Sequence, residues 1–254
     1  MNISITFYFF VVGAVLASFY GVVGERLLRH ESIVKPRSHC TFCNHELKAF
    51  ELIPIFSYFL LKGKCRYCKK KLNIYYPIME FLTGLLFAIS YMKFEFSYEL
   101  WISLILISLM VLIFITDLKE MIILDSPLII SVVLIFFLKW FYFDIKTALL
   151  SLTHGLVLFI FMLIIGFLGR IIYKREALGG GDIKLSFVIG MTLGIPMGFI
   201  SLVLSTFLAL PYATFSLITK TSKEVPYGPF LAGSLYLVFM FVEKFSYLLA
   251  LLYF

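Results

Sequence analysis

Long runs of uncharged residues limit what this chain can fold into more than any other feature of its sequence. The run 3–24 has 22 residues without a charge, and about 20 apolar residues suffice for a helix to cross a bilayer. The run 185–219 has 35 uncharged residues, too many for one span, and the turn-forming segment 194–198 divides it into two shorter helices. The other apolar runs are 73–92 (interrupted by Glu80), 100–116, 126–143 (interrupted by Lys139), 147–169 and 225–242. The sequence therefore predicts an all-α polytopic membrane protein with about eight transmembrane helices.

The composition excludes the main alternatives. Hydrophobic residues make up 61% of the chain and charged residues only 15%, whereas soluble domains carry roughly 25% charged residues. These values fit neither a soluble globular domain nor a disordered chain. No basic segment precedes the first apolar run and no small-residue cleavage site follows it, so we expect a retained helix rather than a signal peptide.

The basic residues indicate how the chain is oriented in the membrane. There are 22 Lys and Arg residues and a net charge of +7, a balance that in a polar protein would suggest a nucleic-acid partner. If segment 25–72, which holds 11 of them, lies in the cytoplasm, alternation of the spans puts 18 basic residues inside and 4 outside. This bias predicts both termini outside. The excess of basic residues is thus explained by the orientation of the spans and by contact of segment 25–72 with anionic headgroups of the lipid bilayer. We therefore expect no nucleic-acid partner.

All four cysteines lie in segment 25–72, as two CxxC pairs with 21 residues between them. Each pair can direct two sulfurs at one tetrahedral centre, so the two pairs supply the four thiolates of a closed, structural zinc site. The alternative is a pair of disulfides, which a reducing cytoplasm disfavours. His39 and His45 flank the first pair, but with four thiolates available we interpret them as surface residues. The predicted zinc ligands are Cys40, Cys43, Cys65 and Cys68.

Two aspartates stand at the predicted ends of spans, where each ionisable group is a functional hypothesis. Asp117 follows an apolar run, at a helix end that disfavours negative charge. Asp182 follows three glycines, where a helix N-cap is a good structural explanation. For Asp125, which precedes a Ser-Pro pair, we prefer the N-cap interpretation.

The predicted topology places Asp117 and Asp182 at one depth on the cytoplasmic side, although they are 65 residues apart. Two adjacent carboxyls share a proton, so one can activate a water while the other protonates or polarises a peptide carbonyl. The glycines at 179–181 would let a substrate backbone or a helix approach Asp182 closely. The residues alone support aspartic proteolysis and helix capping about equally.

The aspartates and cysteines belong to a longer series of motifs. These are the segments 17–26, 40–43, 51–58, 63–68, 76–80, 179–185 and 226–230. Together they resemble the type IV prepilin leader peptidase/N-methyltransferases, a family of membrane aspartic proteases with a GxGD motif. Asp117 corresponds to the first catalytic aspartate of that family, and Asp182, in Gly-Gly-Gly-Asp, to the second. The sequence departs from the family pattern at Leu124, and at Ala17, Gly21 and Leu28 in the segment associated with methyl transfer.

The resemblance implies an endopeptidase that removes the short basic leader of type IV prepilins or pseudopilins after a glycine, at the cytoplasmic face of the bacterial inner membrane. It also implies methylation of the new N-terminal amine by S-adenosylmethionine. On this interpretation 1–24 is the first span, 25–72 is a cytoplasmic zinc-binding loop associated with methyl transfer, and 73–254 holds helices two to eight with the peptidase site. The motif residues expected along the approach of the substrate are Gly179, Gly181 and Lys184.

Two other polar residues lie within predicted spans. For Glu80 we slightly favour an ion pair with a Lys or Arg over a contact to the substrate, and for His154 a hydrogen bond between helices. A rival hypothesis is a transporter whose acids line an ion path, which requires acids at mid-membrane depth and an internal repeat. Another makes the zinc loop a docking module for a pilus assembly ATPase, which leaves the Gly-Gly-Gly-Asp segment unexplained. The oligomeric state stays open.

Overall fold

The computed structural model describes residues 2–174, 178–219 and 225–252, and every regular element in these ranges is a helix. Arg175, Lys220 and Lys223, which the count of basic residues included, lie outside these ranges. The chain divides into two compact units, residues 1–100 and 101–254. The apolar run 73–92 therefore groups with the N-terminal run, whereas the sequence-based division placed it with the later helices.

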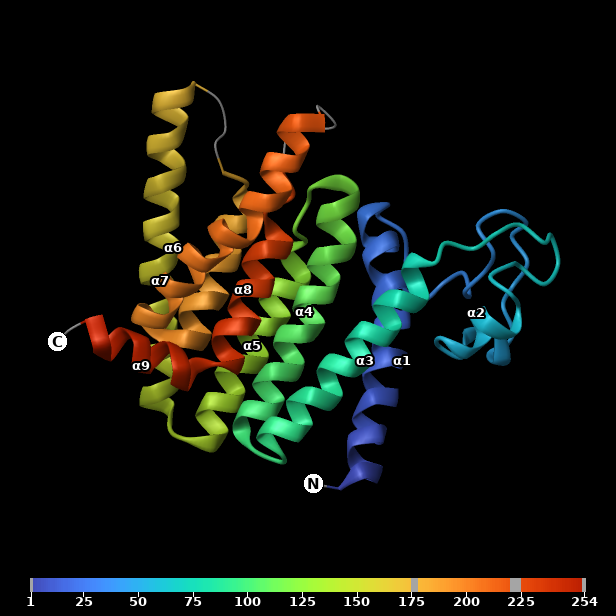
Figure 1. The fold of residues 1–254 in the computed structure, drawn as a ribbon, viewed down its shortest axis with the longest axis horizontal. Coiled ribbons are helices and arrows are strands. Elements are labelled where there is room, and N and C mark those ends of the chain that lie inside the picture. Colours follow the sequence, from blue (N-terminus) through green and yellow to red (C-terminus); the bar gives the residue numbers. More distant parts are fainter. Residues whose placement is uncertain (1, 175–177, 220–224, 253–254) are drawn as a thin grey trace. The chain divides into compact units, whose positions relative to one another are not determined.

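The first unit contains two long helices, α1 (Ile3–Leu28) and α3 (Tyr75–Phe94) (Figure 1). The segment that joins them, residues 29–74, carries the four cysteines and is called the cysteine loop below. Its regular structure is limited to a 3₁₀ turn, η1 (Ala49–Leu52), and the short helix α2 (Phe56–Leu60). The loop is thus poor in secondary structure and needs other interactions to hold its conformation.

Helices α1 and α3 pack closely because glycines face the partner helix. A Cβ atom on Gly13 would lie 2.8 Å from the Phe87 ring, and one on Gly84 would lie 2.7 Å from the carbonyl oxygen of Phe10. Small residues at the contact are a common means by which membrane helices approach each other.

Arg26, in the last turn of α1, organises the start of the cysteine loop. Its side chain is 7% exposed and donates hydrogen bonds to backbone carbonyls of the loop. The neighbouring Glu25 accepts a hydrogen bond of 2.5 Å from the Tyr76 hydroxyl of α3. The carbonyls that Arg26 binds are those of Ser32, Ile33 and Arg37.

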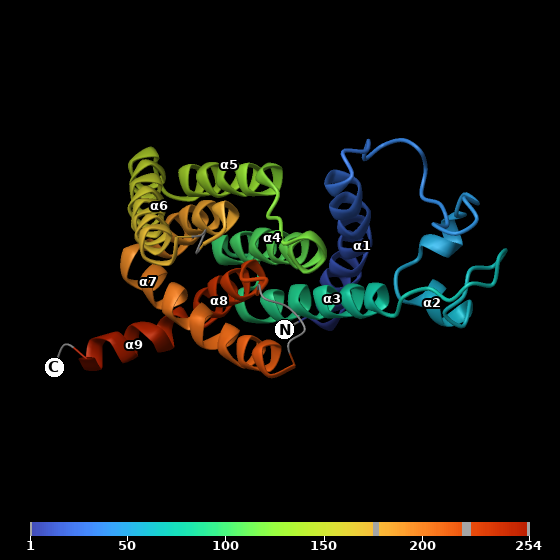
Figure 2. The ribbon, with the colours of Figure 1, turned by 90° about the horizontal axis from the view of Figure 1, so that it is seen from above.

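The second unit contains nearly all of α4 and the helices that follow it. Within this unit α7 packs against α5, α6 and α8, as Figure 2 shows from above. The described helices are α4 (Tyr98–Glu120), α5 (Asp125–Tyr142), α6 (Ile145–Tyr173), α7 (Gly180–Thr219), α8 (Gly228–Met240) and α9 (Val242–Leu252).

Helix α7 is interrupted at Gly194, whose φ of 76° and ψ of 179° are not helical. The parts before and after this residue run in different directions (Figures 1 and 2). In the last turn before the interruption, the Met191 carbonyl accepts a hydrogen bond of 2.6 Å from the Lys139 ammonium of α5. Carbonyls at a helix end lack intrahelical partners, so Lys139 has a structural use inside its span. The predicted division of the long apolar run is confirmed at Gly194.

Helices α6 and α7 cross where glycines remove the side chains between them. A Cβ atom on Gly190 would lie 2.5 Å from the His154 carbonyl oxygen and 3.0 Å from the Cα atom of Gly155. His154 therefore lies at a helix crossing, where its backbone makes the close contact; its hydrogen bond between helices stays a prediction.

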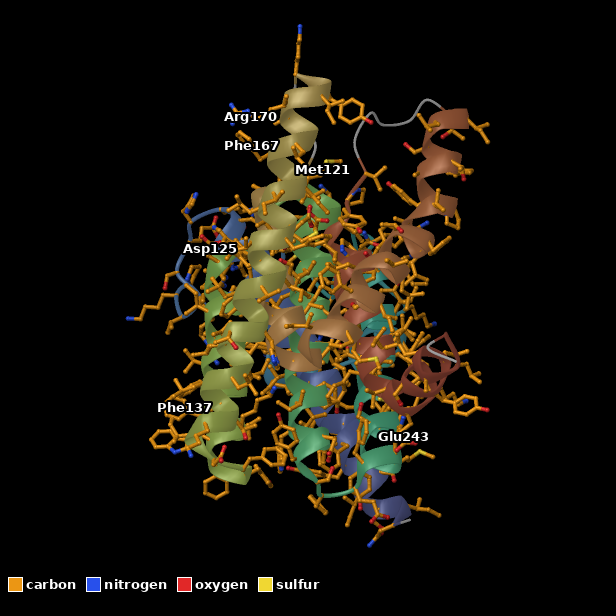
Figure 3. All side chains as sticks on the ribbon, turned by 90° about the vertical axis from the view of Figure 1, so that its left-hand side faces the viewer. Met121, Asp125, Phe137, Phe167, Arg170 and Glu243 are labelled. Atoms are coloured by element: carbon orange, nitrogen blue, oxygen red, sulfur yellow. The ribbon has the colours of Figure 1, made fainter. Side chains whose placement is uncertain are left out.

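Six of the described helices, α1 and α3 to α7, are long and apolar enough to cross a membrane, and the pair α8 and α9, bent by 83°, makes up to seven. The predicted eighth span arises from α7, whose 40 residues form two parts. Large apolar side chains such as Phe137 and Phe167 are 53% and 60% exposed and point outward (Figure 3). Such surfaces are expected to face lipid, so the chain is a multi-pass membrane protein.

Candidate active site and metal centre

Asp117 lies in the last turn of α4 and is 5% exposed. Its Oδ2 atom accepts a hydrogen bond of 3.1 Å from the backbone N–H of Gly228, the first residue of α8. The first N–H groups of a helix have no partner within it, and they carry the positive end of the helix dipole. The start of α8 thus offsets the unfavourable position of a negative charge at the end of α4.

Asp182 is the third residue of α7 and is 8% exposed. Because the helix begins at Gly180, Asp182 is not the N-cap that the sequence left as an alternative. Its carboxyl lies close to the backbone of Gly179, where a Cβ atom would be 3.0 Å from Oδ2. Asp182 also experiences the charge of Asp117, from which 65 residues separate it. The two buried carboxyls, called the aspartate pair below, therefore interact electrostatically.

The three glycines before Asp182 have different surroundings. A Cβ atom on Gly181 would lie 2.6 Å from the Cβ atom of Ile123, so the space beside Gly181 is filled by this isoleucine. Among the described residues, nothing lies within 4 Å of a Cβ atom on Gly180. The space beside Gly180 is therefore open, whereas the space beside Gly181 is filled.

The segment 225–227, which precedes α8, contributes a second polar contact near the pair. The Tyr227 hydroxyl forms a hydrogen bond of 2.6 Å with the Ser205 hydroxyl of α7, and Tyr227 experiences the charge of Asp182. The motif 226–230 had no role that its residue types alone could indicate. Its contact with Asp117 depends on a backbone N–H, which no side-chain pattern reveals.

Lys184 forms an ion pair with Asp125, with Nζ 2.6 Å and 2.8 Å from the two carboxylate oxygens. The predicted capping role of Asp125 is wrong: the N-cap of α5 is Leu124, and Asp125 is the first helical residue. In Figure 3, Asp125 and Met121 lie toward the same end of the second unit, and Phe137 lies toward the other. Because both ion-pair partners are about half exposed, the pair contributes little to stability.

Glu80, in the first unit, has uncharged partners. Its Oε2 atom accepts a hydrogen bond of 2.7 Å from the backbone N–H of Ile55 in the cysteine loop, and Ser18 of α1 donates to the same carboxyl. The ion pair favoured from the sequence is therefore not what holds this acid. Glu80 lies in the second turn of α3, not in mid-span, and connects the loop to both long helices.

The four cysteine sulfurs gather in the cysteine loop, all within 4.8 Å of one another. Cys40 and Cys68 have sulfurs 3.9 Å apart, and Cys43 and Cys65 have sulfurs 4.0 Å apart. Four sulfurs at about 2.3 Å from one tetrahedral ion would lie about 3.8 Å from each other. The arrangement therefore fits zinc, and the separations are too long for disulfide bonds.

The two CxxC turns have the same backbone conformation. The Cys40 N–H donates to the His45 carbonyl at 3.0 Å, and the Cys65 N–H donates to the Lys70 carbonyl at 2.9 Å. The residue after each second cysteine has a positive φ, 55° at Asn44 and 59° at Lys69. This internal symmetry is what two equal halves of one tetrahedral site require.

The surroundings of the sulfurs also favour metal binding. Hydrogen bonds from the backbone of Cys68 and Tyr67 outweigh desolvation and lower the pKa of the Cys65 thiol to about 7. At Cys43 the backbone of His45 lowers the pKa, but desolvation and the three neighbouring sulfurs raise it overall to about 11. A divalent cation removes this competition between thiolates, because it stabilises all four in the ionised form.

Neither histidine near the first cysteine pair belongs to the cluster. The His45 ring packs against the ring of Tyr67, and the His39 Nδ1 atom lies 2.9 Å from the Arg37 carbonyl oxygen. The metal-ligand group among the described residues of this loop consists of the four cysteines.

Comparison with known proteins relates both units to one kind of enzyme. Residues 11–94 match a profile described as the bacterial peptidase A24 N-terminal domain, and residues 104–214 match one described as the type IV leader peptidase family. The boundary between the two compact units, after residue 100, falls in the interval between the two matches.

Curated relatives carry the name prepilin leader peptidase/N-methyltransferase. That of Bacillus subtilis is 36% identical over 201 residues, 74% of this chain and 73% of the relative. That of Myxococcus xanthus is 36% identical over 190 residues, 73% of this chain and 55% of the relative. That of Vibrio cholerae is 31% identical over 204 residues, 74% of this chain and 77% of the relative. No solved structure gives a match.

Proposed function

Because this chain belongs to the type IV leader peptidase family, we propose that it is a membrane aspartic endopeptidase that removes the short basic leader of type IV prepilins or pseudopilins after a glycine. Asp117 and Asp182 are its catalytic residues, and the new N-terminus is then methylated. The observation that carries the proposal is the aspartate pair itself, two buried carboxyls of which Asp182 experiences the charge of Asp117, with the exposed Gly180 two residues before Asp182.

The aspartate pair can hydrolyse a peptide bond with one shared proton. The ionised carboxylate takes a proton from a water, whose oxygen bonds to the carbonyl carbon, while the protonated carboxyl gives its proton to the carbonyl oxygen. The resulting tetrahedral diol then collapses: one of its hydroxyls returns a proton to the ionised carboxylate as the carbonyl re-forms, the C–N bond breaks, and the leaving amine takes a proton from the other carboxyl. The two carboxyls end with one proton between them, as they began. Sequence and geometry leave open which aspartate begins as the base.

The depth of the acids supports a peptidase rather than a transporter. Asp117 is in the last turn of α4 and Asp182 in the first turn of α7, so both lie at ends of membrane helices and not at mid-span. A peptide bond between a polar leader and an apolar helix would be held at such a boundary. The 11 basic residues of segment 25–72 favour the cytoplasmic side for this chemistry. Lys184, beside Asp182 and paired with Asp125, lies on the proposed substrate side.

Zinc is the cofactor that the cysteine loop would hold, through Cys40, Cys43, Cys65 and Cys68. With four thiolates the coordination is complete, so the ion is structural and leaves no position for a substrate. It would supply folding energy to a loop that has little secondary structure of its own.

Loss of the cysteine ligands is expected to unfold the loop. Cys40→Ser with Cys65→Ser should reduce bound zinc from about one ion per chain to a small fraction of that value. It should also make the cysteine loop sensitive to a protease, while helices of residues 101–254 stay protected. Metal analysis and limited proteolysis with mass spectrometry would measure both effects, with His39→Ala as the matched control that keeps zinc. Full zinc content in the double serine variant would refute the assignment.

S-adenosylmethionine would supply the methyl group of the second reaction. An apolar groove beside Asp125, with a volume of about 390 Å³, is lined by side chains such as Leu128, Phe159 and Phe187. Its charged groups are Asp125 and Lys184, which pair with each other, so the groove does not fit an adenosyl group. We therefore assign no residue to this cofactor and derive no step through it.

A defined substrate tests both activities. The purified full chain in lipid would be incubated with a peptide that has a basic leader, a Gly-Phe junction and an apolar helix. We expect one cut, after the glycine. With S-adenosylmethionine we also expect a mass increase of one methylene group on the apolar fragment, which carries the new N-terminal amine. An intact peptide, with the protein folded and zinc bound, would contradict the peptidase; a cut without the mass increase would contradict the methyltransferase alone.

A further inference from the structure

Ile123 occupies a position at the aspartate pair that the proposed mechanism does not use. It belongs to residues 121–124, which connect α4 to α5 and begin with Met121 at a φ of 54°. The side chain is partly exposed. In sequence it is six residues from Asp117, on a connection whose course the apolar pattern does not predict.

The Ile123 side chain lies against both segments that carry or bind the catalytic acids. A Cβ atom on Gly181, the residue before Asp182, would be 2.6 Å from its Cβ and 3.3 Å from its Cδ1. A Cβ atom on Gly228 would be 2.9 Å from its Cδ1 and 3.0 Å from the Oδ2 atom of Asp117. The Ile123 Cδ1 atom and the Asp117 carboxyl therefore both lie next to Gly228, and the same methyl group lies next to Gly181.

The two glycines before Gly181 are not covered by Ile123. Gly179 and Gly180 are exposed, and among the described residues nothing lies within 4 Å of a Cβ atom on Gly180. A substrate backbone can reach the pair over these glycines. Its residue at the scissile carbonyl then faces the Ile123 side chain, because the carbonyl must come within reach of both carboxyls.

We propose that Ile123 restricts the residue on the carbonyl side of the scissile bond to glycine. This inference rests on the proposed peptidase function and deepens it. A glycine of the substrate fits next to the aspartate pair because it has no side chain. The Cβ atom of any other substrate residue would take the space of the Ile123 side chain, which packs against Gly181 and Gly228 and cannot easily move. Removing atoms from Ile123 opens that space without touching either carboxyl.

The test compares two peptides that differ at one residue, with a Gly-Phe or an Ala-Phe junction after the same basic leader. The ratio of kcat/KM for the glycine peptide to that for the alanine peptide is measured for the wild type, Ile123→Val and Ile123→Ala in lipid. Ile122→Ala is the matched control, because Ile122 is the neighbouring residue and is 50% exposed. Thermal melting checks that each variant is folded.

We expect the wild type to prefer the glycine peptide strongly, the ratio to fall at least tenfold in Ile123→Ala and by a smaller factor in Ile123→Val, and the control to keep the wild-type ratio. A ratio unchanged within twofold in an active Ile123→Ala overturns the inference. If Ile123→Ala cuts neither peptide, an unchanged ratio in Ile123→Val overturns it as well. A wild type that cuts neither peptide refutes the peptidase function itself, which is a distinct result.

Discussion

Asp117→Asn and Asp182→Asn should each abolish cleavage of the Gly-Phe peptide, lowering kcat by roughly 10²–10⁴-fold, the usual contribution of a general acid or base. Asparagine has the shape of aspartate but can neither take a proton from water nor donate an acidic proton to the carbonyl. In Asp117→Asn the side-chain oxygen can still accept the Gly228 N–H, so the backbone there should hold its position. Single-turnover cleavage followed by mass spectrometry measures the loss.

Glu120→Gln is the matched control for this prediction. Glu120 is the last residue of α4, three positions after Asp117, and it is exposed. This variant should keep the wild-type rate, and all three variants should melt within a few degrees of the wild type. If either asparagine variant still cut the peptide at a tenth of the wild-type rate, that aspartate would not be a catalytic residue.

Gly228→Ala should have the second largest effect, although it adds only one methyl group. That group would lie 2.9 Å from Ile123 Cδ1, 3.0 Å from Asp117 Oδ2 and 3.0 Å from the buried Ile113. Overpacking of this kind costs about 1–3 kcal/mol. If that cost displaces the aspartate pair and raises the activation free energy equally, kcat/KM falls roughly 5- to 150-fold, since about 1.4 kcal/mol is a factor of ten.

Gly233→Ala provides the comparison within the same helix. Among the described residues nothing lies within 4 Å of a Cβ atom on Gly233, so alanine there should leave kcat/KM unchanged and should support the helix slightly. Equal activities for Gly228→Ala and Gly233→Ala would mean that the contacts around Gly228 do not position Asp117.

The features that were predictable from the sequence are those whose physical cause is local. A helix must be about 20 apolar residues long to cross a bilayer, so uncharged runs predict spans, and Gly194 divides the longest run because it can adopt a positive φ. A CxxC turn directs its two sulfurs by itself, so the metal cluster followed from spacing. The short α9 after Val242 was missed because it is separated from α8 by a bend, not by a change in apolar character.

Contacts between residues far apart in the sequence could not be predicted from such local patterns. Asp125 looks like an N-cap in sequence, yet it pairs with Lys184, 59 residues away. Glu80 looks like half of an ion pair, yet a backbone N–H of Ile55 and the Ser18 hydroxyl satisfy it. In both cases the partner was chosen by how the helices pack, and a local pattern contains no information about that choice.

The sequence by itself determined that this chain spans a membrane, carries a four-cysteine site and offers two aspartates at helix ends, because hydrophobic length, ligand spacing and charge are properties of short segments. Only the tertiary structure decided that Gly228 donates its N–H to Asp117, that Ile123 fills the space beside Gly181, and that Gly180 is left open. The physical reason is that every residue except proline has a backbone N–H, and that the space beside a residue depends on its neighbours in the fold. Neither can be assigned a role until packing places it next to a carboxyl.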